Sequence, residues 1–237
     1  MTDGALRFRY RFRFASGREA EVEVELDRDA LESRRQPKQA PEWTRLDFHR
    51  CSHCPLAASE PDCPLAVRLV PLVEACRGVA SHDPVAVEAV LPERSAHLST
   101  TAQRAFSSLM GLLVATSGCP YTDFLKPMAR FHLPMASEEE TVYRAVSMYL
   151  LGQYFKQREG LAADWELTGL IAAYRDLRVV NKAMAERLRP ASERDSAVNA
   201  LVLLDLLAKM VPYSVEDSLA DIRYLFDPYF PVPSAGR

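Results

Sequence analysis

Hydrophobic and charged residues alternate one by one in two N-terminal segments, residues 6–14 and 19–26. Leucine, phenylalanine and tyrosine alternate with arginine in the first segment, and alanine, valine and leucine alternate with glutamate in the second. A period of two residues is typical of a β-strand with one buried and one exposed face. Because Ser16-Gly17 lies between the two segments, the sequence predicts a β-hairpin.

The charges of this hairpin favour one register. A three-residue loop over residues 16–18 sets Arg13, Arg11 and Arg9 opposite Glu21, Glu23 and Glu25. The same register sets Phe12 on Val22. A two-residue loop would set Phe12 against Glu21 instead. The arginine row by itself suggests a nucleic-acid surface, but paired with glutamates it forms a self-neutralised outer face. We therefore expect no nucleic-acid partner.

Apolar alternation over residues 85–91 predicts a third strand, and helical spacing dominates the remaining chain. Ser137 and Glu140 form a capping-box pattern that predicts a helix ending near Arg158. The middle of that helix, residues 145–155, has no charged side chain and is expected to be buried on most sides. The sequence predicts helices over residues 64–78, 100–117, 120–131, 138–158, 165–189, 192–210 and 214–226.

These elements predict an α+β protein in which a small N-terminal antiparallel hairpin or three-stranded sheet packs on a mainly α-helical bundle. Residues 1–95 would hold the hairpin, a cysteine-rich segment and the first helix. Residues 96–237 would form the helical bundle. We expect the two regions to make one compact unit.

The composition and charge of the chain argue against nucleic-acid binding and against a membrane span. The net charge of the 237-residue chain is −3, which gives no general attraction to nucleic acid. The longest uncharged stretch, residues 105–122, is interrupted by polar residues and by Pro120, so we expect a core helix and no membrane span. The N-terminus has no apolar signal segment, and we therefore expect a protein of the reducing cytoplasm.

The cysteines form the one local pattern that points to metal binding or redox chemistry instead of packing. Cys51 and Cys54 form a Cys-x-x-Cys pair, and Cys63 follows soon after. Cys54, Cys63 and Cys119 each precede proline, which is favoured at the first position of a helix. Each of these three cysteines is therefore expected at a helix N-cap, where the helix dipole stabilises a thiolate.

A tetrahedral metal site needs a fourth ligand besides Cys51, Cys54 and Cys63. Cys119 is the first choice because it follows a helix end and lies off any apolar stripe. The alternatives are His49, His53 and His132. Structural zinc is the favoured metal. An iron–sulfur cluster or haem is the alternative cofactor. The simplest interpretation is that the four cysteines are reduced thiols that bind no metal. A zinc site would suit a regulatory or protein-interaction role with an unidentified protein partner.

Four residues have interpretations other than metal binding. Cys119 and His132 could form a nucleophile pair in an enzyme, although no third orienting group is evident. Asn181 lies on the apolar seam of the helix over residues 165–189, where it could fix helix register or line a polar pocket. Cys76 shares a stripe with Leu65 and Leu69 and is expected to be a small core residue.

Four motifs resemble those of a family of bacterial proteins that is recorded only as a domain of unknown function. The resemblance covers nearly the whole chain and implies a bacterial, cytosolic protein. It implies no activity, cofactor or catalytic residue. The motifs are Cys51-Ser52-His53-Cys54-Pro55-Leu56, Thr116-Ser117-Gly118-Cys119-Pro120, Pro127-Met128-Ala129-Arg130-Phe131-His132-Leu133-Pro134 and Glu139-Glu140-Thr141-Val142-Tyr143-Arg144.

Overall fold

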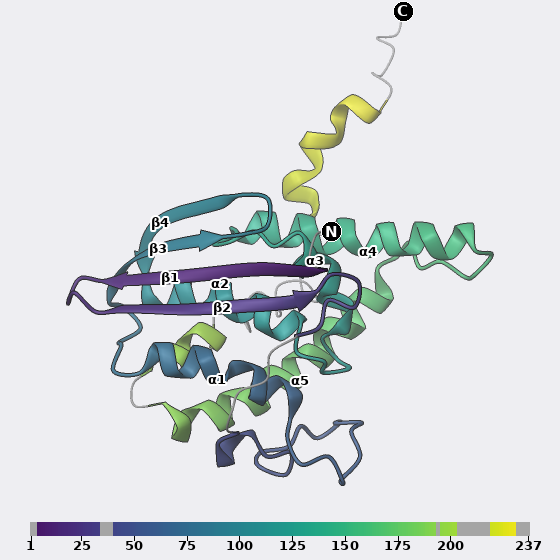
Figure 1. Cartoon of the computed structure of the whole chain (residues 1–237). Coiled ribbons are helices and arrows are strands. Elements are labelled where there is room, and N and C mark those ends of the chain that lie inside the picture. Colours follow the sequence, from purple (N-terminus) through teal and green to yellow (C-terminus); the bar gives the residue numbers. More distant parts are fainter. Residues whose placement is uncertain (1–3, 34–39, 193–194, 203–218, 231–237) are drawn as a thin grey trace, which may run out of the picture.

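The computed structural model describes residues 4–33, 40–192, 195–202 and 219–230, and within them it shows the predicted α+β fold (Figure 1). A four-stranded antiparallel sheet has the order β2-β1-β3-β4. The strands are β1 Ala5–Phe14, β2 Glu19–Asp27, β3 Pro84–Val90 and β4 Ser95–Thr101. The helices are η1 Glu42–Thr44, α1 Pro64–Cys76, α2 Ala102–Ala115, η2 Asp123–Leu125, α3 Lys126–Arg130, α4 Glu138–Arg158, α5 Thr168–Ala191 and η3 Arg223–Tyr229.

The hairpin and its charge pattern are confirmed, but the predicted register is wrong by two residues. Arg13 pairs with Glu19, and Arg11 pairs with Glu21. The loop therefore covers residues 15–17, one position earlier than predicted, with Gly17 at a φ of 82°. A shift of two residues keeps every side chain on its face, so hydrophobic patterning alone could not detect the error.

The outer face of the sheet is neutralised by ion pairs, as expected from the alternation. Arg11 contacts both Glu21 of β2 and Glu88 of β3, at 3.0 and 3.1 Å. Arg13 contacts Glu19 at 3.3 Å. The arginine row is thus matched by carboxylates from both neighbouring strands.

The inner face of the sheet packs on the helices and forms one continuous core with them (Figure 1). Phe8, Tyr10 and Phe12 are fully buried, and the rings of Phe12 and Phe106 of α2 lie 4.9 Å apart. α1 packs against both α2 and α5. The core draws buried side chains from both sequence regions, including Cys76, whose predicted place in the core is confirmed.

Three predictions about the helical part need correction. Residues 95–101, of which the last two were expected to begin a helix, form strand β4 and extend the three-stranded sheet to four strands. The helix predicted over residues 120–131 is a turn followed by the short η2 and α3. The middle of α4 is not buried on most sides, because α4 extends past the sheet and leaves Leu151, Tyr154 and Phe155 exposed (Figure 1).

The capping box that opens α4 is confirmed, with Ser137 Oγ accepting from the Glu140 amide and the Glu140 carboxylate accepting from the Ser137 amide. Residues 196–202 and 219–222 are helical, and most of the helix predicted over 192–210 lies outside the described residues. Within the described part of the chain, no helix is long and apolar enough to cross a membrane.

Candidate functional site

The cysteine-rich segment is a loop closed by backbone hydrogen bonds at its base. The Cys63 amide donates to the carbonyl of Thr44, and the Leu46 amide donates to the carbonyl of Pro61. An isolated bridge between Arg45 and Asp62 reinforces this pairing. The closure brings Cys63 back beside the start of the loop that carries Cys51 and Cys54.

The Cys-Pro dipeptides behave as predicted at one of their three positions. Cys63 is the N-cap of α1, with an extended backbone, Pro64 in the first turn and an exposed fraction of only 7%. No helix follows Cys54 directly, and Cys119 begins a turn in which its carbonyl accepts from the Thr122 amide. Proline at the next position thus marks a restricted backbone in all three cases, but a helix start only at Cys63.

The Cys119 loop is attached to the Cys51–Cys54 loop, although the two lie far apart in the sequence. The ring of Tyr121 stacks on His53 with centroids 4.0 Å apart and an interplanar angle of 6°. The Tyr121 hydroxyl also donates to the His53 carbonyl oxygen at 2.9 Å. The prediction that Cys119 belongs near the cysteine segment is therefore supported by contacts that do not involve sulfur.

Burial and neighbouring thiols raise the pKa of two of the predicted ligands, Cys51 and Cys119. Burial raises the pKa of Cys119 to about 12, and the thiols of Cys63, Cys51 and Cys54 contribute to the rise. Burial, Cys63 and Cys54 raise the pKa of Cys51 to about 11. Backbone amides of Ala66 and Leu65 in the first turn of α1 favour the Cys63 thiolate, but burial outweighs them and the pKa is raised.

The thiols are nevertheless not arranged as a closed site. Among the described residues, which include all five cysteines, no three His, Cys, Asp or Glu side chains have the geometry to hold a metal ion. Among the described residues, these thiols therefore do not form the tetrahedron that zinc requires.

A buried arginine that the sequence analysis missed lies beside these thiols. Arg187 of α5 is 1% exposed and donates to the carbonyls of Trp43, Arg45 and Leu46, at 3.0, 2.6 and 3.0 Å. Its charge lowers the pKa of both Cys51 and Cys63, against the effect of burial. Arg187 follows Val180 and Met184 on the buried stripe of α5, and a charged residue on such a stripe was the signal available in the sequence.

The three histidines considered as ligands have different surroundings. His49 is exposed and packs edge-on against Phe48. His53 places Nε2 3.1 Å from the Asp176 carbonyl oxygen, while its buried Nδ1 has no hydrogen-bond partner. His132 hydrogen-bonds to Tyr10 in the core, and burial lowers its pKa to about 3. His53 is thus the histidine whose free nitrogen could serve as a ligand beside the cysteines.

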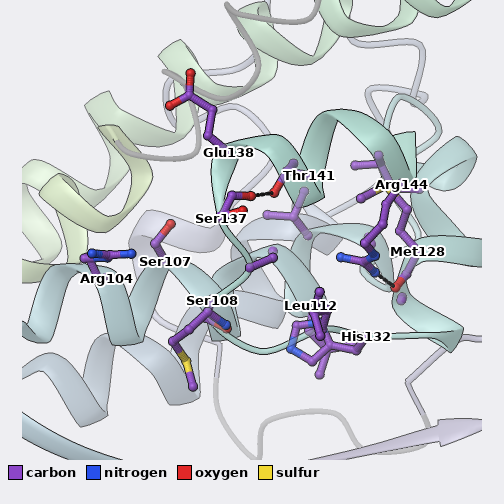
Figure 2. Close-up of a pocket in the computed structure, with 18 of the residues that line it drawn as sticks. Arg104, Ser107, Ser108, Leu112, Met128, His132, Ser137, Glu138, Thr141 and Arg144 are labelled. Carbon is purple, nitrogen blue, oxygen red and sulfur yellow. Dashed lines mark hydrogen bonds between the residues drawn. The ribbon is translucent and has the colours of Figure 1, made fainter. Parts of the chain in front are cut away.

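The structure does not support Cys119 and His132 as the nucleophile and base of an enzyme. His132 lines a cavity of about 490 Å³ between α2, α3, α4 and α5, and Cys119 is not among the residues that line it (Figure 2). The Cys119 thiol instead interacts with the other three cysteines. The two residues thus belong to different regions, and the structure offers no nucleophile–base pair there.

Comparison with known proteins places the chain in a family of undetermined function. Residues 8–227 match the model of a family described as a domain of unknown function (DUF6901), and the chain belongs to this family. Neither the curated proteins nor the solved structures include a significant match. The match confirms the predicted membership of a family that is described only as a domain of unknown function, and it assigns no activity.

Proposed function

We propose that this protein binds one structural zinc ion through the thiolates of Cys51, Cys54, Cys63 and Cys119 in a reducing cytoplasm. The observation that carries the proposal is the attachment of the Cys119 loop to the Cys51–Cys54 loop through Tyr121 and His53, next to the loop base that Cys63 closes. Binding would require these loops, which Tyr121 and His53 already hold together, to close around the ion.

The charges of the region suit a bound cation. Burial, with a smaller contribution from repulsion by neighbouring thiols, raises the pKa of Cys51 and Cys119, so without a cation these thiols stay protonated at neutral pH. A divalent ion removes that repulsion and deprotonates coordinating thiols. Four thiolates around one Zn²⁺ leave a net negative centre, and Arg187 supplies a compensating positive charge that needs such a partner.

A four-thiolate site is closed, because no position is left for water or substrate, and its role is therefore structural. The ion would fasten the loop over residues 40–63 to the loop that follows α2. The folded unit then serves regulation or protein interaction. A group of exposed apolar side chains on and after α4 favours an interaction role, and its members are Leu151, Tyr154, Phe155, Leu161 and Trp165.

Elemental analysis of protein purified without oxygen tests the proposal. We expect about one zinc per chain in the wild type and strong loss of zinc in Cys63→Ser and Cys119→Ser. Cys76→Ala is the matched control, because Cys76 is buried on α1 away from the other thiols and should leave the zinc content unchanged.

The other outcomes separate the alternatives. Unchanged zinc in Cys119→Ser together with loss in His53→Ala would assign the fourth position to His53. Iron with sulfide and a coloured protein would replace zinc by an iron–sulfur cluster, and a haem absorption band would indicate haem. Unchanged metal content in both Cys51→Ser and Cys63→Ser would disprove the site.

A further inference from the structure

A second candidate site lies apart from the cysteines, in the cavity between α2, α3, α4 and α5 (Figure 2). Its volume of about 490 Å³ falls in the range of small-molecule sites. Most of its wall is apolar. The apolar side chains that line it include Leu112, Leu125, Met128, Leu133, Met135 and Leu177.

Three polar groups that can donate hydrogen bonds line the cavity from α4 and α5. Asn181 is only 3% exposed, and its side-chain Nδ2 has no hydrogen-bond partner. The Tyr174 hydroxyl stays protonated, because burial raises its pKa, and the charge of Arg144 acts on it. Tyr174, Leu177 and Asn181 share one face of α5, which sets the two polar groups on the same wall.

Arg144 supplies the positive charge of this wall. Its Nη2 donates to the carbonyls of Met128 and Phe131, both at 2.9 Å, and Figure 2 shows the side chain directed toward Met128. No carboxylate of the described residues lies within ion-pair distance of the guanidinium; Glu140 acts on it only from farther away. Burial lowers the pKa of Arg144, which is the expected effect on a half-buried cation that lacks a close counter-charge.

The other ionisable groups that line the cavity do not change the positive charge of its interior. Arg104 and Glu138 are exposed, carry opposite charges and lie apart from Arg144 (Figure 2). His132 is neutral at physiological pH and is already hydrogen-bonded to Tyr10. The interior therefore combines one positive charge, further donors and a large apolar surface.

We propose that this cavity binds an aliphatic monocarboxylate, with its carboxylate on Arg144, Tyr174 and Asn181 and its chain against the apolar wall. A carboxylate accepts several hydrogen bonds and provides the missing counter-charge, whereas an alcohol or ester of the same length provides no charge. The apolar chain supplies the burial energy that the polar contacts alone would not. This assignment does not depend on the metal centre.

Calorimetric titration of the purified protein tests the assignment. The probes are octanoate, decanoate and dodecanoate, each compared with the alcohol of the same chain length. We expect the carboxylates to bind at least about tenfold more tightly than the matched alcohols, because a charge-assisted contact in a partly buried site is worth that factor.

Variants locate the carboxylate. Arg144→Gln should weaken carboxylate binding about tenfold and leave alcohol binding unchanged. Arg158→Gln is the matched control, since Arg158 ends the same helix and does not line the cavity. Ala136→Phe fills the cavity without altering Arg144 and should abolish binding of both probe series, which keeps the test informative if Arg144→Gln folds poorly.

Three results would overturn the assignment. These are the absence of carboxylate binding by the wild type, equal binding of carboxylates and alcohols, and unchanged carboxylate affinity in Ala136→Phe. Because none of these measurements reads the zinc content, failure here is distinguishable from failure of the metal site.

Discussion

At the scale of single residues, the two most informative side chains are the buried Arg187 and the half-buried His132, whose surroundings the sequence did not reveal. Arg187 holds the segment before the cysteines through three carbonyls. His132 is fixed against Tyr10, whose hydroxyl also lies 3.0 Å from Ser108 Oγ. A buried polar group is informative because it persists only where partners compensate for its desolvation.

His132 gives a prediction about pH. Burial, with a smaller contribution from Arg144, lowers its pKa from 6.5 to about 3 in the folded protein. Below pH 6.5 the unfolded chain therefore binds a proton that the folded chain excludes, and the free energy of unfolding falls as pH decreases toward 3. The slope from this group is at most about 1.4 kcal/mol per pH unit.

Denaturant unfolding across this pH range measures the effect. His132→Gln should lower stability at neutral pH, because Tyr10 loses a partner, and should show a smaller loss of stability with acid than the wild type. His97→Gln, which changes an exposed histidine of β4, should follow the wild-type pH dependence. Identical pH profiles for wild type and His132→Gln would show that His132 is not held neutral.

At the scale of elements, the sequence predicted helices and strands best where the determining interactions lie within a few residues of one another. The Ser137–Glu140 capping box and the alternation of β1 and β2 were both visible in the sequence and are both present. Hairpin register was not fixed by the same information, because a slip of two residues exchanges one arginine–glutamate pairing for another. The loop conformation, with Gly17 in the left-handed region, selects between them.

The capping box gives a prediction at this scale. Ser137→Ala removes the acceptor for the Glu140 amide and should lower the free energy of unfolding by about 1 kcal/mol. Ser147→Ala is the control, because Ser147 is exposed in the middle of the same helix, where alanine is neutral or slightly stabilising. Equal effects of the two substitutions in denaturant unfolding would show that the cap contributes nothing.

At the scale of the whole molecule, the proposed zinc ion joins segments that are distant in sequence. Its removal by a strong chelator should lower the melting temperature by several degrees, because binding free energy that acts only on the folded state is lost. Calorimetric scans should show the same shift in Cys76→Ala. Cys119→Ser should have a lower melting temperature than the wild type before chelator is added, and the chelator should change that temperature little. A shift in this variant as large as that of the wild type would contradict the assigned ligands.

By itself the sequence determined the elements whose residues repeat at a fixed period and the cysteines that could bind a metal. Periodicity is a local property, so β1, β2, β3, the N-terminus of α4 and the core place of Cys76 follow from it. Cys51, Cys54, Cys63 and Cys119 were likewise selected by spacing and by the prolines beside them.

Only the tertiary structure determined which strands pair and which surfaces the elements pack against or leave exposed. β4 is a mostly exposed edge strand, so its place rests on backbone pairing with β3 and leaves no hydrophobic pattern. Leu151 and Phe155 are exposed because α4 extends past the sheet, which no property of α4 itself predicts. The cavity and the position of Arg187 beside the thiols likewise arise where separate helices and loops come together, and long-range packing of this kind is not encoded in any local window.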